Sequence, residues 1–160
     1  IRGVFSHWLD ITLTYYVAYR INKPYKYLLY PRKLRPDFHL TDQQILPGFE
    51  DWQVIKSPGH TDRDISLYHP QSGNIYVGDS IVKVKQRFIS PFPVHHPNQY
   101  KNTLSKFIEL QPQKILLAHG GINDASSVDL AGLKKTSPKR PSATSHFLRH
   151  YLYRKLVKRK

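Results

Sequence analysis

Apolar residues recur at steps of three and four near the start of the chain. The repeat runs through Phe5, Trp8, Leu9, Thr12, Leu13 and Tyr16. This period is that of an amphipathic helix with one buried face. We therefore predict a helix over residues 4–19 that is ended by Asn22 and Pro24.

The same period returns later in the chain. Over residues 97–110, Leu104, Phe107 and Ile108 would face inward, and Pro112 lies just beyond the last helical position. A second helix is predicted there.

Between and after these segments the pattern shortens to strand-like runs. Alternating or short apolar stretches predict strands over residues 53–56, 65–69, 74–77 and 114–117. Pro70-Gln71-Ser72-Gly73 predicts a hairpin turn between the second and third of them. Strands followed by helices indicate an α/β or α+β layer rather than a helix bundle.

The length and the charge distribution divide the chain into a body and a tail. At 160 residues, of which 39% are hydrophobic, there is enough chain for one compact domain and too little for two. We assign residues 1–136 to that domain, residues 137–145 to a linker and residues 146–158 to a C-terminal helix. The net charge is +14, and residues 134–160 hold ten Lys and Arg and no acid. The tail therefore supplies most of the positive field.

The basic tail admits three interpretations. It is a solvated extension, it lies on an anionic membrane surface through a helix with Leu148, Leu152 and Leu156 on one side, or it follows a nucleic-acid backbone. The first is our default interpretation, and the position of the excess charge, away from the candidate site described next, counts against a nucleic-acid-processing enzyme.

The absence of cysteine restricts the chemistry. Without a thiolate, any metal must be held by His, Asp or Glu. The same absence fits a reducing compartment, and we expect a cytoplasmic protein. No apolar run approaches the length that spans a bilayer.

Three candidate ligands each follow a predicted strand. His60, Asp79 and His119 come after the strands that end near residues 56, 77 and 117. Side chains just past the ends of neighbouring strands converge at one sheet edge. Each taken alone has an ordinary explanation: Gly78-Asp79 is a common turn, and a single His is more often structural. The ordered set predicts a metal site.

The ordered set also resembles a known family. Ser57-Pro58-Gly59-His60-Thr61, then Gly78-Asp79, then Ala118-His119-Gly120-Gly121 is similar to the second half of the metallo-β-lactamase-fold hydrolases. The resemblance covers residues 52–121.

The resemblance implies an αβ/βα sandwich and a reaction. One or two ions, usually Zn²⁺ and otherwise Fe or Mn, would provide a metal-bound hydroxide that attacks an ester, thioester, lactone, amide or phosphoester. His60 would complete the first metal site, Asp79 would bridge both ions and be essential to catalysis, and His119 would ligate the second. Thr61 would orient a ligand without touching the metal.

The chain departs from the family pattern in one respect. The family's upstream His-x-His-x-Asp-His element is absent, and His7 and His39 stand alone. Because the chain also starts at Ile1 and contains no Met, we expect coding sequence upstream of it. The alternative is a remnant that does not catalyse.

Three functions therefore compete. The leading one is a zinc-dependent hydrolase of a small ester-, thioester- or lactone-like substrate. The others are a nucleic-acid-processing enzyme of the same fold and an inactive binding module. His95-His96, in the Pro-rich segment over residues 90–97, is either a loop over the site or a solvated connector, and we favour the connector.

Overall fold

The computed structural model describes two parts of the chain. Residues 36–142 are described continuously, and before them Trp8, Asn22 and residues 11–12, 14–16 and 18–20. The chain divides into two compact units, Ile1–His39 and Leu40–Lys160, and each is taken by itself below. The expected boundary after residue 136 stays a prediction.

The first unit contains a helical segment. Every described residue between positions 8 and 20 is helical. Asn22 takes a left-handed φ of 52°, and its N–H donates to the Tyr19 carbonyl at 3.2 Å, which is a usual way for a helix to end. The predicted helix and its stop at Asn22 are confirmed for these residues, while Pro24 lies outside the described part.

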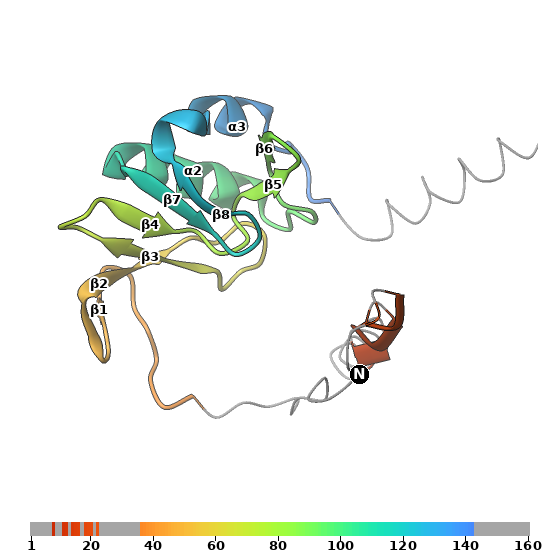
Figure 1. Ribbon diagram of the computed structural model, residues 1–160, viewed down its shortest axis with the longest axis horizontal. Helices are drawn as coiled ribbons and strands as arrows, with labels where there is room; N and C mark the ends of the chain where they lie inside the picture. Colours follow the sequence, from red (N-terminus) through yellow and green to blue (C-terminus); the bar gives the residue numbers. More distant parts are fainter. Residues whose placement is uncertain are drawn as a thin grey trace, which may run out of the picture. The chain divides into compact units, whose positions relative to one another are not determined.

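The second unit is built on a six-stranded mixed sheet in the order β1-β2-β3-β4-β7-β8, beside a two-stranded hairpin of β5 and β6 (Figure 1). The strands are β1 (Ile45–Leu46), β2 (Phe49–Lys56), β3 (Ile65–His69), β4 (Asn74–Tyr76), β5 (Val82–Val84), β6 (Arg87–Ile89), β7 (Lys114–Leu117) and β8 (Gly121–Asp124). The expected strands over residues 65–69 and 114–117 are confirmed at both ends. The expected α/β or α+β class is confirmed as well.

Three strands of the sheet run in the same direction. β3 is antiparallel to both β2 and β4, and β4 is parallel to β7. The carboxyl ends of β2, β4 and β7 therefore lie along one edge of the sheet, and β3 separates β2 from β4. The loops that leave this edge carry His60, Asp79 and His119.

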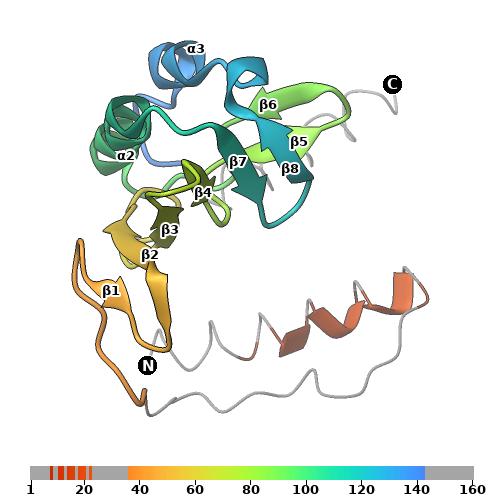
Figure 2. The same ribbon diagram turned by 60° about the vertical axis from the view of Figure 1, so that its left-hand side comes forward.

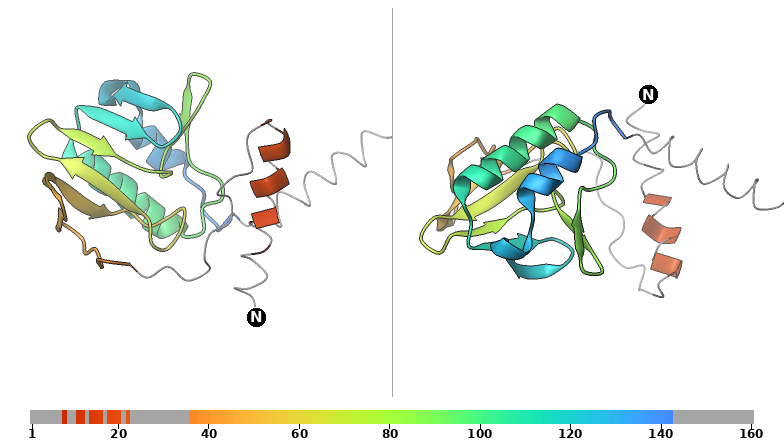
Figure 3. Two further views of the ribbon diagram at one scale, coloured as in Figure 1. Left: turned by 60° about the horizontal axis from the view of Figure 1, so that its bottom comes forward. Right: turned by 90° about the horizontal axis from the view of Figure 1, so that it is seen from above.

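Two helices cover one face of the sheet, α2 (Pro97–Leu110) and α3 (Leu130–Thr136), seen side by side in Figure 3. The buried side chains of α2 include Tyr100, Thr103, Leu104 and Phe107. They recur at steps of three and four, and the apolar ones pack into one cluster with Ile75 and Ile115 of the sheet.

The prediction that Ile108 faces inward is wrong, because its side chain is 38% exposed. Successive helical residues differ by about 100° around the axis, which turns Ile108 away from the face that carries Phe107. Both bounds of the second predicted helix are confirmed. Within the described residues, no helix combines the length and apolar character needed to cross a bilayer.

The sheet face opposite the helices is also apolar. Leu67, Tyr76, Leu116 and Ile122 pair in register across β3, β4, β7 and β8, so their side chains share one face. Figure 2 shows α2 and α3 on the same side of this sheet. Tyr76 is 36% and Ile122 68% exposed.

The start of the expected linker is packed into the second unit. The Val94 N–H donates to the Ser142 hydroxyl at 2.6 Å, and the Ser142 N–H donates to the Val94 carbonyl at 2.9 Å. Ser137, at the end of α3, is buried. The expected tail helix over residues 146–158 lies outside the described residues.

Asp42 links the start of the second unit to α2. Its carboxylate accepts the Lys56 N–H at 2.6 Å and the Lys106 ammonium at 2.9 Å. Burial acts to raise the pKa of Asp42, but these two hydrogen bonds and the nearby charges of Lys56 and Lys106 outweigh it and leave the pKa below its usual value.

We expect Asp42→Asn to lower the free energy of unfolding at pH 7. A carboxyl whose pKa is depressed by folding stabilises the protein above its unfolded pKa, and this stabilisation is lost as the pH falls through the folded value. The side chains of Asp42 and Lys106 are each more than a third exposed. Solvent screening therefore limits the loss of unfolding free energy to about 1 kcal/mol. Urea unfolding at pH 7 and pH 3 measures it. The difference in unfolding free energy between Asp42→Asn and wild type should shrink at pH 3. The control Asp51→Asn, at an exposed position of β2, should not differ from wild type at either pH.

Candidate metal centre

Asp79 and His119 meet at the sheet edge. Asp79 follows β4 and His119 follows β7, and these strands are neighbours. The His119 Nε2 lies 3.8 Å from the Asp79 Oδ1, and both side chains are more than half exposed. The two loops are also joined by the main chain, since the Ala118 N–H donates to the Gly78 carbonyl at 3.4 Å. The structure therefore pairs an imidazole with a carboxylate.

His60 is held in one tautomer. Its Nδ1 lies 2.6 Å from the Pro93 carbonyl oxygen. A carbonyl only accepts, so Nδ1 must carry the proton, and the lone pair of a neutral ring is then on Nε2. Metal-binding histidines commonly use this arrangement, with one nitrogen bonded to a carbonyl and the other toward the ion. Sequence reasoning missed Pro93.

The loop that carries His60 lies against the start of α2. The Thr103 hydroxyl donates to the Pro58 carbonyl at 2.9 Å, and the His96 N–H donates to the Gly59 carbonyl at 3.0 Å. A Cβ placed on Gly59 would lie 2.6 Å from the Cβ of Tyr100 and 2.7 Å from its Cα. Gly59 is therefore required by the helix behind it, a reason that the motif alone does not reveal.

Tyr100 connects the His60 loop to the Asp79 loop. Its ring is fully buried against Gly59, and its hydroxyl donates to the carbonyl of Ser80, the residue after Asp79, at 2.9 Å. Burial raises the pKa of Tyr100 to about 12, although a hydrogen bond with Ser90 lowers it. The hydroxyl thus stays a donor across the physiological range. The spacing of Tyr100 from Leu104 is the sequence signal that could have found it.

Thr61 shapes the same loop from the other side of His60. Its N–H donates to the Asp64 carboxylate at 2.6 Å, its hydroxyl donates to the same carboxylate, and its carbonyl accepts the Gly59 N–H at 2.8 Å. These bonds close a tight loop around His60. β3 begins directly after Asp64, so Thr61 and Asp64 shape a loop before a strand, and the strand is the one that the alternating residues predicted.

The three predicted ligands do not form one cluster. Within residues 36–142, which include all three, no group of three or more His, Asp or Glu side chains is positioned to hold a metal ion. The strand order agrees with this finding. β4 and β7 are neighbours, but β3 lies between β2 and β4, which puts the end of β2 roughly 9.5 Å from that of β4.

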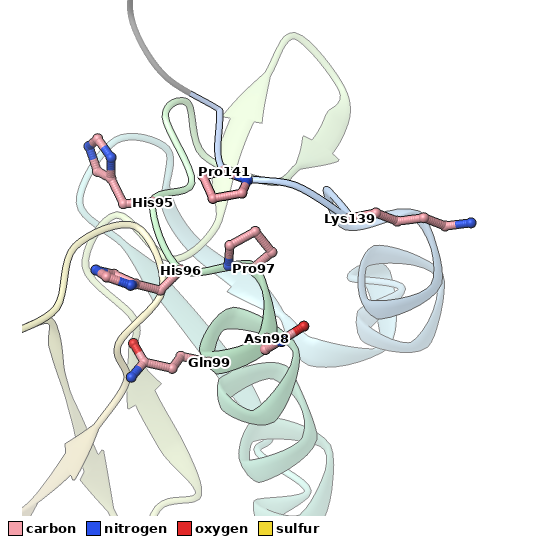
Figure 4. A pocket seen from close by; sticks show the side chains of 7 residues that line it. All are labelled: His95, His96, Pro97, Asn98, Gln99, Lys139 and Pro141. Carbon is pink, nitrogen blue, oxygen red and sulfur yellow. The ribbon is translucent and has the colours of Figure 1, made fainter.

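His95 and His96 border a shallow pocket of about 340 Å³ with the start of α2 and with Lys139 and Pro141. Figure 4 shows the two imidazoles on one side of the pocket and the Lys139 side chain extending from the other, so these groups do not converge. Their main chain does contribute to the site, since the His95 N–H donates to the His60 carbonyl at 3.4 Å. The segment is more than the solvated connector favoured from sequence.

Comparison with known proteins decides the family. The model of the metallo-beta-lactamase superfamily matches residues 5–121, well over half of the chain. The chain belongs to this superfamily. The match extends upstream of the stretch over residues 52–121 on which the sequence resemblance was based.

Individual relatives are longer than this chain. The probable metallo-hydrolase YflN of Bacillus subtilis is 27% identical in an alignment of 94 residues that covers 51% of this chain and 36% of that protein. A metallo-beta-lactamase family protein of Thermus thermophilus aligns with a TM-score of 0.53 and 19% identity, over 63% of this chain and 35% of the other. A metallo-beta-lactamase of Pontibacter korlensis aligns with a TM-score of 0.51 and 16% identity, over 78% of this chain and 55% of the other. These structures support the fold, and the chain spans about a third to a half of each relative.

Proposed function

We propose that this chain contributes to the metal centre of a divalent-metal-dependent hydrolase, and that Asp79 and His119 are its central ligands. The observation that carries the proposal is their convergence from two neighbouring strands to 3.8 Å. Two donors bound to one tetrahedral ion at 2.0–2.2 Å lie roughly 3.4 Å apart. The pair is therefore within a few tenths of an ångström of sharing an ion.

The donor set fits such an ion in kind. Imidazole nitrogen and carboxylate oxygen suit Zn²⁺ and, less exclusively, Fe²⁺ or Mn²⁺. Because the Nδ1 of His60 is bonded to the Pro93 carbonyl, its Nε2 is the nitrogen left for an ion. His60 would hold a second ion beside the pair. Membership of the superfamily supports metal-dependent hydrolysis in general, and the substrate class we propose is a small ester, thioester or lactone.

The residues of this chain would orient the reaction. A divalent ion, when bound, polarises a carbonyl and lowers the pKa of a water to about 7. Asp79 supplies the negative charge that holds the cation. Tyr100 fixes the main chain after Asp79, and Pro93 fixes the ring of His60. Such fixed geometry is what a metal centre needs from its surroundings.

Metal binding by the full chain tests the proposal. We expect wild-type protein to bind Co²⁺, used as a spectroscopic substitute for Zn²⁺, with an absorption spectrum of nitrogen and oxygen ligation. His119→Ala should weaken binding by at least roughly a hundredfold, because losing a ligand exceeds the ~10- to 100-fold cost of losing a group behind one. His96→Ala, which removes an exposed imidazole outside the proposed set, should leave binding unchanged. Equal binding by wild type and His119→Ala contradicts the ligand assignment.

Turnover separates an enzyme from a binding module. We expect hydrolysis of a nitrophenyl ester, a thioester or a lactone that stops on chelation and returns with added ion. Metal binding without turnover of any of these would favour the inactive module. Turnover that survives chelation would contradict the proposal.

A further inference from the structure

The loop that carries His119 has little stiffness of its own. His119 is followed by Gly120 and Gly121, and Gly121 has a left-handed φ of 69°. Glycine pairs leave the main chain with many accessible conformations. The His119 side chain is 80% exposed, so packing does little to fix it. Some other group must hold the loop.

Asn123 holds this loop from inside the sheet. Its side chain is only 8% exposed, and its Nδ2 lies 3.3 Å from the Gly120 carbonyl and 3.1 Å from the Gly121 carbonyl. Both carbonyls thus accept from one buried amide. An amide can keep this orientation only if its Oδ1 also has a donor, because an unpaired buried acceptor is costly.

Lys83 is that donor. Its ammonium lies 2.7 Å from the Asn123 Oδ1, as a charge-assisted hydrogen bond. Lys83 reaches across from β5, which is far from β8 in sequence but packs beside it. A Cβ placed on Gly120 would come within 2.9 Å of the Lys83 Cβ, so the hairpin and the His119 loop are in direct contact.

Phe88 fixes Lys83 in turn. The two residues are directly opposite in the β5–β6 register, and the ammonium lies 5.3 Å from the ring centroid. A cation at this distance from an aromatic ring is attracted to it. Phe88 itself packs against the hydrophobic core. A continuous path of contacts therefore leads from the core through Phe88, Lys83 and Asn123 to Gly120.

We infer that Lys83 is a positioning residue for His119, acting through Asn123. The inference rests on the proposed function in one respect, because it takes His119 to be a metal ligand. Its structural content, that Lys83 orders the loop, stands without any metal. Lys83 acts on the ion only indirectly, through the main chain of the loop.

Loop dynamics without metal form the first arm of the test. Backbone order parameters of Gly120 and Gly121 should fall from about 0.85, the rigid value, toward 0.6 in Lys83→Met. This variant keeps the aliphatic stem and removes the donor. Order parameters in α2 should not change, which separates loop ordering from a general loss of stability. Lys83→Arg should restore the loop. Lys114→Met, at an exposed position at the start of β7, should have no effect.

Metal affinity forms the second arm. Lys83→Met should weaken Co²⁺ binding roughly tenfold, as expected for a group behind a ligand. In a protein that already carries Asn123→Ala, Lys83→Met should not weaken Co²⁺ binding further, because both substitutions break the same path of contacts. Unchanged order parameters of Gly120 and Gly121 in Lys83→Met would overturn the inference. It would also be overturned if Lys83→Met lowered Co²⁺ affinity equally in wild type and in Asn123→Ala. If wild type binds no Co²⁺, the proposed function fails, and the metal-free dynamics still decide the role of Lys83.

Discussion

Replacing Gly59 with alanine should cost the protein more than about 3 kcal/mol of unfolding free energy, because the added Cβ would lie 2.6–2.7 Å from the Cβ and Cα of Tyr100. Overpacking a rigid core costs about 1–3 kcal/mol. Part of the obstacle here is the main chain of α2, which cannot rotate away as a side chain can. The cost therefore falls above that range. We expect α2 and the His60 loop to lose their structure together. Chemical denaturation followed by circular dichroism measures the loss.

Gly48→Ala is the matched control. Gly48 has a left-handed φ of 79°, but a Cβ there would meet nothing within 4 Å. The control therefore reports only the conformational penalty of about 1–2 kcal/mol for a non-glycine residue. If Gly59→Ala is no more destabilising than Gly48→Ala, the close approach of the His60 loop to Tyr100 is not what requires glycine there.

The elements with strong periodicity were predictable from sequence. β3, β7 and α2 begin and end where the pattern of residues placed them. In each, a run of apolar residues at one period is bounded by Pro, Gly or a polar residue, and burial of that one face decides the structure. The predicted strand over residues 53–56 is the second half of β2, whose first half is exposed and therefore shows no apolar alternation.

Elements stabilised by tertiary contacts were missed. β5 and β6 are three residues each, and Phe88 of β6 packs against the hydrophobic core. β8 itself reads Gly-Ile-Asn-Asp, a composition typical of turns, and forms a strand because β7 offers it a free edge. α3 lies in a segment that showed no clear repeat, although the Asp129 side chain caps it by accepting the Gly132 N–H at 2.7 Å.

Sequence reasoning proposed the candidate site as a set of residues but could not give its geometry. Residue order and strand ends placed His60, Asp79 and His119 at one edge, and the parallel course of β2, β4 and β7 agrees. The predicted hairpin placed β3 beside β4, but sequence could not reveal that β4 pairs with β7, which brings Asp79 to His119. Strand order is a property of pairing between distant segments, and no local pattern encodes it.

The supporting residues were hidden for a related reason. Pro93, Tyr100, Lys83 and Asn123 act through contacts with residues 20 to 40 positions away in the chain. In sequence they look like a turn proline, a core aromatic, a surface lysine and a loop asparagine. Their roles depend on which loops the fold brings together. Candidate ligands are therefore visible in motifs, while the groups that orient them are visible only in coordinates.

Asp79→Ala should have the largest effect on function of any single substitution in the chain. Asp79 supplies the carboxylate of the central pair, and its Oδ1 lies 3.8 Å from the His119 Nε2. Its loss would remove both the proposed ligand and the negative charge that would offset the cation. Because charge stabilisation by a metal contributes several kcal/mol, we expect turnover of an ester or lactone to fall by at least roughly a thousandfold. Metal content should fall in parallel without loss of all metal, since His119 and His60 remain.

The fold should survive this substitution, which makes the result interpretable. The Asp79 side chain is about half exposed, and the adjacent main chain keeps its bond from Tyr100 to the Ser80 carbonyl. Asp62→Ala is the matched control, because Asp62 is an exposed carboxylate near His60 whose ion pair with Arg63 spans 3.8 Å at the surface. Loss of turnover and metal in Asp79→Ala, with both retained in Asp62→Ala, would tie the activity to the position of the carboxylate rather than to acidity near the loop. Normal turnover in Asp79→Ala would mean that the reaction takes place elsewhere, and the pairing of Asp79 with His119 would then be only a surface contact.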